Sequence, residues 1–259
     1  MSASPFVSVS VRDTLRRHQL DSFDALWNVA AQQVDEPNRA RGGFSSVSRL
    51  MLEDANGQPQ AFYLKRQSNY LIRNLRRPLG EPTAGREFYN IGRYAERGIP
   101  ALEAAYYAQR RVDGKVQAIL LTRALEGYQP LDHWFSRWDQ LGYRLQRDLV
   151  IAAAALVAQL HGSGVVHNCL YPKHLFLKPL ADGVGVRLID LEKSRAHLFS
   201  PWGNMRDLDA LNRRSQAPSR TQRLRFLLTY LGKSEVDAQV RYWATRVTRR
   251  SASKRKGRK

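Results

Sequence analysis

The chain has 259 residues, which is enough for one large domain or for two lobes of roughly 100 to 150 residues with their own cores. A composition of 43% hydrophobic and 25% charged residues is that of an ordinary globular protein and excludes wholesale disorder. The 42 Lys and Arg outnumber the 23 Asp and Glu, giving a formal net charge of +19. This balance favours a polyanionic partner, without deciding among nucleic acid, anionic lipid and phosphorylated glycan.

Cysteine content and apolar runs predict a cytoplasmic protein. The chain has one cysteine, so no internal disulfide can form, as is typical of a reducing compartment. Residues 1–16 lack a basic start followed by an apolar segment, and we expect no secretory signal. The longest apolar run, residues 149–157, is too short to span a bilayer. Peripheral contact with a membrane face remains compatible with these features.

The first half of the chain is predicted to be strand-rich. Phe23, Leu26, Trp27 and Ala30 share one helical face, which predicts a helix over residues 22–33. Apolar runs separated by turn signals predict four strands at residues 47–52, 61–66, 104–111 and 116–123. A helix is expected over residues 85–97, and residues 67–84 are basic and turn-rich.

The second half is predicted to be mainly helical. A long helix is expected over residues 143–161, ended by Gly162, and a short apolar strand over residues 186–191. From residue 204 the pattern is again helical, and the Lys- and Arg-rich tail is expected to be disordered. The predicted α+β organisation comprises an N-terminal helical extension, a strand-rich lobe, a helical lobe and a disordered basic tail, over residues 1–40, 41–125, 126–248 and 249–259.

Lys65 is a lysine in an otherwise apolar strand, which costs free energy to bury unless an anion meets it. Glu87, on the inward side of the following helix, is the expected partner. The alternative is that Tyr63 and Lys65 line a solvated strand face while Phe62 and Leu64 face the core. Both interpretations are consistent with the alternation of the strand.

Gly42 and Gly43 lie about twenty residues ahead of Lys65. Glycines there let backbone N–H groups approach a phosphate closely. No Gly-Lys-Ser/Thr follows, so this is not a Walker loop. An ordinary turn is the alternative.

A polar segment, residues 165–177, directly follows the long predicted helix and contains His167, Cys169 and His174. Asp190 ends the next apolar strand, 21 residues after Cys169. A carboxylate at a strand end is a ligand that a divalent cation favours.

The same residues allow other interpretations. His161, His167, Cys169 and His174 could form a metal cluster, but their spacing matches no structural zinc motif. A Cys/His nucleophile pair is another alternative, for which no third positioning residue can be named. His167 could also be a satisfied core histidine and Cys169 a small buried apolar residue.

In this order and at these intervals, Lys65, Glu87, the 167–177 segment and Asp190 resemble the protein-kinase-like fold. The closer resemblance is to its lipopolysaccharide core (Kdo/heptose) kinase branch, the WaaP and InaA type, over about residues 40 to 212. It implies a two-lobed protein that uses ATP and Mg²⁺. In it, Lys65 would hold the ATP phosphates and Glu87 would hold Lys65.

The resemblance also implies further roles. Gly42 and Gly43 would lie in the loop over the nucleotide, His174 and Asp190 would hold the metal, and Asp207 would brace the catalytic loop. An N-terminal helix acid is the alternative reading of Asp207.

Cys169 departs from the resembled pattern, because it occupies the place of the protein-kinase catalytic aspartate. A thiol, with a reference pKa of about 8.5, is a poor substitute for a carboxylate base. Two functions follow as hypotheses. The first is a kinase that phosphorylates a heptose or Kdo hydroxyl of the lipopolysaccharide inner core, with Lys65, Cys169 and Asp190 at its catalytic positions. The alternative is a pseudokinase, a nucleotide-binding or scaffolding module without catalysis.

The expected partner is the lipopolysaccharide core or another anionic glycolipid. The basic stretch at residues 73–77 and the basic tail are predicted to contact an anionic inner-membrane surface. Nucleic acid is the third possibility, suggested by charge alone, and it leaves Lys65, Glu87 and Asp190 unexplained. We therefore rank it last.

Overall fold

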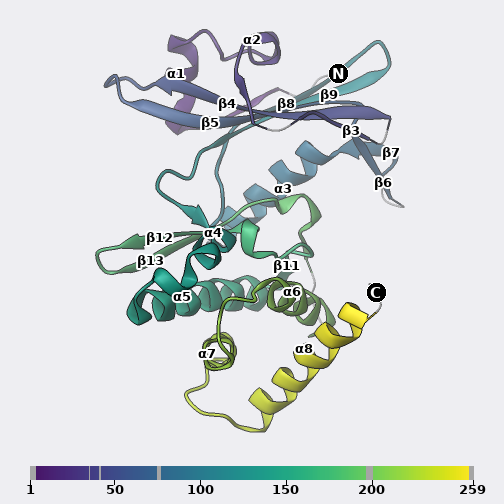
Figure 1. The fold of residues 1–259 in the computed structure, drawn as a ribbon. Helices are drawn as coiled ribbons and strands as arrows, with labels where there is room; N and C mark the ends of the chain where they lie inside the picture. Colours follow the sequence, from purple (N-terminus) through teal and green to yellow (C-terminus); the bar gives the residue numbers. More distant parts are fainter. Residues whose placement is uncertain (1–3, 35, 41, 75–76, 197–200, 257–259) are drawn as a thin grey trace. The chain divides into compact units, whose positions relative to one another are not determined.

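The computed structural model describes residues 4–34, 36–40, 42–74, 77–196 and 201–256 (Figure 1). The chain forms two compact units: unit 1 is Met1–Arg93 with Leu102–Glu126, and unit 2 is Tyr94–Ala101 with Gly127–Lys259. Unit 1 is strand-rich and unit 2 is mainly helical, which agrees with the expected α+β organisation. The division after Glu126 lies next to the predicted lobe boundary.

Unit 1 is built on one large antiparallel sheet. The strands of this sheet are β1 (Phe6–Val7), β2 (Gln32–Gln33), β3 (Asn38–Ala40), β4 (Gly43–Glu53), β5 (Pro59–Ser68), β8 (Ala104–Val112) and β9 (Lys115–Arg123). Unit 1 also contains β6 (Leu71–Asn74) and β7 (Arg77–Pro82), which form a separate two-stranded sheet. Its helices are α1 (Arg12–Arg17), α2 (Phe23–Asn28) and α3 (Thr83–Glu96), the last of which ends in unit 2, and Val9–Val11 forms a 3₁₀ turn.

The sheet order β1-β8-β9-β5-β4-β2 places β5 in the middle of the large sheet, between β4 and β9. Helices α1 and α2 lie on one side of this sheet and α3 on the other (Figure 1). Along β5, Phe62 and Leu64 are fully buried in the apolar core, and the intervening Tyr63 is exposed. Lys65 therefore projects from the sheet face opposite this core.

The N-terminal residues form part of unit 1 instead of the separate extension that we expected. Val11, Leu15, Leu20 and Leu26 are buried in the same apolar cluster as Leu64. Burial of these side chains against the sheet ties the segment to the unit.

The helix predicted over residues 22–33 is shorter than expected. Helix α2 ends at Asn28, and Val29 has an extended ψ of 133°. Gln32 and Gln33 then pair with β4. Backbone pairing with the sheet replaces the helical bonds that the apolar stripe predicted, so tertiary context overrides a local preference here.

Residues 67–84, expected to be turn-rich, contain the antiparallel hairpin β6–β7. Paired strands satisfy backbone groups that a loop would leave to water. Arg73 of the predicted basic stretch is exposed, whereas Arg76 lies outside the described residues.

Unit 2 contains five helices and five short strands in its described part. The strands are β10 (Gln129–Pro130), β11 (Val165–Val166), β12 (Leu175–Leu180), β13 (Gly183–Leu188) and β14 (Arg195–Ala196). The helices are α4 (Leu131–Ser136), α5 (Tyr143–Gly162), α6 (Pro201–Arg214), α7 (Arg220–Leu231) and α8 (Ala238–Lys256), with 3₁₀ turns at Trp138–Gln140, Pro172–His174 and Leu191–Lys193.

Helix α5 is the central element of unit 2 and matches the predicted long helix. Its residues Leu149, Val157 and Leu160 are fully buried. The strand predicted over residues 186–191 ends earlier, at Leu188, because Asp190 leaves the extended conformation.

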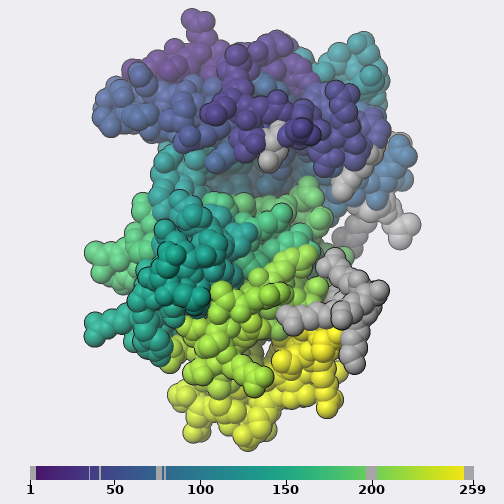
Figure 2. All heavy atoms as spheres, in the orientation of Figure 1, coloured from purple at the N-terminus to yellow at the C-terminus, as the bar shows by residue number. Residues whose placement is uncertain are grey.

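We expected the basic tail to be disordered from residue 249, but α8 continues to Lys256. Residues 257–259 lie outside the described part. The Ser251 hydroxyl is buried and donates to Asp209 Oδ1 at 2.9 Å. The Asn212 side chain donates to the same hydroxyl at 3.1 Å. These bonds attach α8 to α6, and Figure 2 shows the yellow surface of α8 adjoining the lime surface of α6 and α7. Within the described residues, no helix is both long and apolar enough to cross a membrane.

Candidate active site

The ion pair expected between Lys65 and Glu87 is present in unit 1. Lys65 Nζ donates to Glu87 Oε2, from central strand β5 to the second turn of α3. The side chain of Glu87 is 7% exposed and that of Lys65 is 23% exposed. Lys65 is therefore held by a buried anion, which distinguishes it from an ordinary solvated strand lysine.

Helix α3 is fixed to the end of β5 by a side chain that the sequence did not single out. Gln67 Oε1 accepts from the Ala84 N–H at 2.9 Å, and its amide donates to Thr83 Oγ1 at 2.7 Å. This buried glutamine satisfies the first turn of α3 and so fixes the start of the helix that carries Glu87.

Gly42 and Gly43 form the tight connection between β3 and β4, where Ala40 pairs with Gly43. Gly42 has a φ of +75°, which favours glycine. A Cβ on Gly43 would lie 2.2 Å from the carbonyl oxygen of Ser68. Close approach of this loop to the end of β5 therefore requires glycine at position 43 for structural reasons.

In unit 2, two segments meet at the residues predicted to hold a metal. The Ile189 N–H donates to the His174 carbonyl at 3.1 Å, which joins the end of β13 to the 3₁₀ turn before β12. Asp190 then adopts the left-handed conformation, with φ 58° and ψ 56°. A non-glycine residue in this conformation is uncommon and is often part of a functional site. The turn directs the carboxylate of Asp190 to His174, where Oδ2 lies 3.3 Å from Nε2.

The two ring nitrogens of His174 have different surroundings. Nδ1 donates to the Cys169 carbonyl oxygen at 2.7 Å, so Nδ1 carries a proton. Burial lowers the pKa of His174 below its ordinary value, against the opposing effect of the Asp190 charge. Nε2 is thus the nitrogen that can serve as a ligand to a cation.

Cys169 is buried beside this pair. Its side chain, His174 and Asp190 each offer one ligand atom, and these atoms all lie within 4.8 Å of one another. Lys193 Nζ lies 3.9 Å from Cys169 Sγ, a contact with no signal in the sequence. The position expected of a catalytic base is therefore occupied by a thiol among a histidine, a carboxylate and an ammonium.

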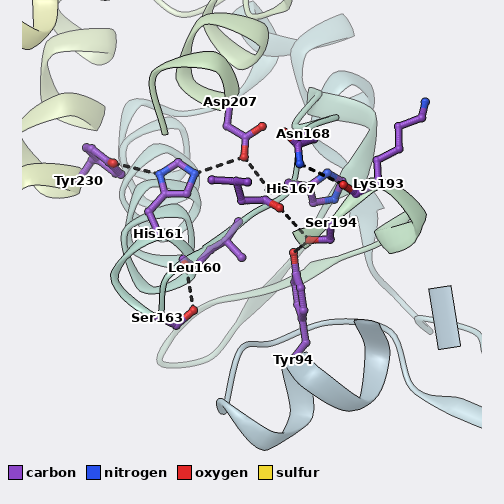
Figure 3. Close-up of polar contacts among 11 residues, drawn as sticks. Tyr94, Leu160, His161, Ser163, His167, Asn168, Lys193, Ser194, Asp207 and Tyr230 are labelled. Carbon is purple, nitrogen blue, oxygen red and sulfur yellow. Dashed lines mark hydrogen bonds and ion pairs between the residues drawn. The ribbon is translucent and has the colours of Figure 1, made fainter. Parts of the chain in front are cut away.

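The backbone of the loop is braced as predicted by Asp207 of α6 (Figure 3). Asp207 Oδ2 accepts from the His167 N–H at 2.7 Å and lies 3.3 Å from His161 Nε2. His161 in turn contacts the Tyr230 hydroxyl at 2.9 Å. A buried carboxylate thus links the start of the loop to α5, α6 and α7.

A second set of bonds in Figure 3 holds the segment after Asp190. The Ser194 hydroxyl donates to the Val166 carbonyl at 3.0 Å and lies 2.6 Å from the Tyr94 hydroxyl. The Asn168 amide donates to the Lys193 carbonyl at 3.0 Å. Hydrogen bonds that link residues 193 and 194 to residues 168 and 166 therefore join the segment after Asp190 to the loop.

The four-residue metal cluster considered from the sequence does not form. His161 is engaged by Asp207 and Tyr230, and His167 Nε2 donates to the Ile189 carbonyl at 2.9 Å. His167 is fully buried, and burial lowers its pKa below the ordinary value. This is the behaviour of a core histidine.

A Cys/His nucleophile pair is also unsupported by these contacts. Such a pair requires an imidazole nitrogen directed at the thiol. The nitrogens of His174 are instead directed at a carbonyl and at Asp190, and Lys193 is the polar group beside the sulfur.

Comparison with known proteins agrees with this geometry. The model of the lipopolysaccharide kinase (Kdo/WaaP) family matches residues 24–230, which is 207 of the 259 residues. Protein InaA of Escherichia coli is 27% identical over 180 residues, covering 69% of this chain and 81% of that protein. The lipopolysaccharide core heptose(I) kinase WaaP of Pseudomonas aeruginosa is 32% identical over 158 residues, covering 57% of this chain and 59% of that protein.

A solved structure, that of WaaP in complex with acyl carrier protein, matches with a TM-score of 0.69 and 21% identity. The match covers 96% of this chain and 98% of that one, and it shows that the fold is shared. The family match and the shared fold identify a phosphotransferase of the protein-kinase-like fold. The chain belongs to the lipopolysaccharide kinase (Kdo/WaaP) family. This membership favours a kinase over a scaffolding module without catalysis and over a nucleic-acid-binding protein.

Proposed function

We propose that this protein transfers the γ-phosphate of ATP to a heptose or Kdo hydroxyl of the lipopolysaccharide inner core. The acceptor is suggested by the family and by the heptose(I) kinase relative. The observation that carries the proposal is the buried Lys65–Glu87 ion pair, because a kinase of this fold requires that pair to bind nucleotide phosphates.

Lys65 is proposed to bind the α- and β-phosphates of ATP. Glu87 holds the ammonium in place, so little conformational entropy is lost when an anion arrives. The loop at Gly42 and Gly43 is proposed to offer backbone N–H groups to the phosphates.

Asp190 is proposed to hold a divalent cation, Mg²⁺, with His174 as its neighbour. The carboxylate fits, since Mg²⁺ sites at phosphates use one or two carboxylates and several waters. The nitrogen of His174 and the sulfur of Cys169 are poorer ligands for Mg²⁺. Bound there, the cation would neutralise charge on the phosphates.

The kinase is proposed to work without a carboxylate at position 169. Phosphoryl transfer depends mainly on positioning and charge neutralisation, so the acceptor hydroxyl can react without a strong base. The Asp207 bonds keep the loop in place for this purpose.

A cytoplasmic site of action at the inner-membrane surface fits the charge of the chain. The net charge is +19, and Arg241, Arg246 and Arg249 of α8 are exposed. Each basic residue near an anionic membrane contributes about 1 kcal/mol of binding. These residues are proposed to bring the protein to its glycolipid acceptor.

The proposal is tested by transfer of labelled γ-phosphate from Mg-ATP to purified core lipopolysaccharide. Asp190→Asn and Lys65→Ala should each reduce transfer by at least about 100-fold, as expected for loss of charge stabilisation. Asp182→Asn, in the exposed turn between β12 and β13, is the matched control and should retain transfer. Absence of transfer by the native protein, with ATP still bound, would overturn the proposed acceptor.

A further inference from the structure

The side chains of Cys169, His174 and Asp190 converge from two segments of unit 2, with their ligand atoms all within 4.8 Å of one another. We propose that these three residues form a binding site for a thiophilic divalent cation, Zn²⁺, on the nucleotide-free protein. The set combines a sulfur, an imidazole nitrogen and a carboxylate oxygen, which are the three donor types that Zn²⁺ uses in proteins.

The hydrogen bonds of His174 point to a cation. Because Nδ1 donates to the Cys169 carbonyl, Nε2 is left with a lone pair in the neutral ring. That lone pair faces the carboxylate oxygen Oδ2 of Asp190 at 3.3 Å. Two acceptors at this distance repel each other unless a proton or a metal ion lies between them. A histidine whose far nitrogen is held by a backbone carbonyl is also the usual arrangement of a metal ligand.

The distances fit a tetrahedral ion. With Zn–N and Zn–O bonds of about 2.0 Å, tetrahedral geometry places the two ligand atoms about 3.3 Å apart, as found for His174 and Asp190. With a Zn–S bond of about 2.3 Å, the sulfur must lie about 3.5 Å from the nitrogen. The ligand atoms lie within 4.8 Å of one another, so Cys169 Sγ would have to approach the histidine nitrogen by about 1.3 Å at most.

The donor set selects Zn²⁺ over Mg²⁺. Thiolate ligands favour soft and borderline metals, whereas Mg²⁺ favours oxygen. Lys193 is the cation that already lies near the sulfur, and its exposed side chain can turn into solvent when a metal binds. Three protein ligands leave a fourth position for water or another oxygen ligand, as in zinc sites that react.

The site bears on the regulation of the proposed kinase. Zn²⁺ bound to Asp190 occupies the carboxylate that the Mg²⁺ of Mg-ATP requires, so Zn²⁺ and Mg-ATP compete. This consequence rests on the proposed function, whereas binding of the metal does not.

The test is a titration of the chelator-treated, full-length protein with Co²⁺, followed by displacement with Zn²⁺. A thiolate bound to Co²⁺ gives an intense sulfur-to-metal charge-transfer absorption. Cys169 is the only cysteine of the chain, so this absorption can come from no other residue. The variants are Cys169→Ser, His174→Gln and Asp190→Asn, with the exposed His133→Gln of α4 as the control. Circular dichroism checks that each variant is folded.

We expect the charge-transfer band in the native protein and in His133→Gln, its loss in Cys169→Ser, and its displacement by Zn²⁺, which binds more tightly than Co²⁺. His174→Gln and Asp190→Asn should weaken Zn²⁺ binding by at least about 10- to 100-fold. A native protein with no band would overturn the proposal. So would a band that persists unchanged in folded Asp190→Asn, since the cysteine would then bind metal without its partners. Neither result depends on phosphate transfer, so the failure of this inference and the failure of the proposed function are distinguishable.

Discussion

Asp207 braces the loop that carries Cys169. Its buried carboxylate accepts from the His167 N–H and faces His161. Asp207→Asn removes the charge and should lower the free energy of unfolding by about 1.5 to 3 kcal/mol, the contribution of a hydrogen bond to a charged group. Urea denaturation measures this change. The exposed Asp182→Asn should leave stability within about 0.5 kcal/mol, and an equal effect of both substitutions would contradict the bracing role.

Glycine is required at position 43 by the packing of the loop, and this requirement can be tested separately from the proposed phosphate contact. Gly43→Ala places a Cβ 2.2 Å from the Ser68 carbonyl, so the loop or the end of β5 must move. We expect a loss of about 2 kcal/mol or more in thermal or urea unfolding. Gly92→Ala is the control, because a Cβ there would meet no atom within 4 Å other than its chain neighbours and the backbone of its own helix α3. That substitution should stabilise the protein by up to about 1 kcal/mol.

Tyr107 provides a prediction on alkaline stability. Burial raises the pKa of Tyr107 from 10.0 to about 12. As the pH rises above 10, the unfolded phenol ionises first, so stability that is fully present below this value is lost as the pH approaches 12. Tyr107→Phe removes this titration, and its loss of stability between about pH 8 and about pH 11 should be smaller than that of the native protein. Identical pH profiles in urea unfolding would contradict the assignment.

Among the helices, α8 is attached to α6 through the Ser251 hydroxyl, which explains why the basic tail is ordered as far as Lys256. Ser251→Ala removes the buried hydroxyl that joins α8 to Asp209 and Asn212, and should cost about 1 to 3 kcal/mol. Ser253→Ala, exposed on the same helix, should be nearly neutral. Hydrogen exchange of the α8 amides should rise in Ser251→Ala and stay native in Ser253→Ala. Fast exchange of α8 in the native protein would contradict its attachment to α6.

The elements that could be predicted from sequence are those whose pattern is long and strongly periodic. Helix α5 and strands β4, β5, β8 and β9 follow from apolar periodicity and turn residues. The structure differs from the prediction at residues 22–33, 67–84 and 249–256. In the first and the last, the outcome depends on a partner distant in sequence, β4 for Gln32–Gln33 and Asp209 for Ser251, whereas at residues 67–84 the two strands of a local hairpin pair with each other. Local composition carries no information on such partners.

For the whole molecule, the order and spacing of Lys65, Glu87, the 167–177 segment and Asp190 predicted which residues would bind the phosphates and which would hold the metal. Glu87 was found because a lysine in an apolar strand requires an anion. The grouping of Cys169 with His174 and Asp190 could not be found in this way, because it depends on the left-handed turn at Asp190 and on the bond from Ile189 to His174. Asp190 and His174 were predicted to hold a metal, but the sequence does not show that the side chain of Cys169 points toward them.

The central claim is that the native protein is a kinase despite Cys169. The measurement is the rate of γ-phosphate transfer from Mg-ATP to core lipopolysaccharide by the native protein, Cys169→Asp and Asp190→Asn under the same conditions. We expect the native rate to exceed that of Asp190→Asn by at least about 100-fold and Cys169→Asp to add less than about 100-fold, the lower end of what a general base contributes. A native rate equal to that of Asp190→Asn, with activity appearing only in Cys169→Asp, would contradict the account and identify a degenerate site.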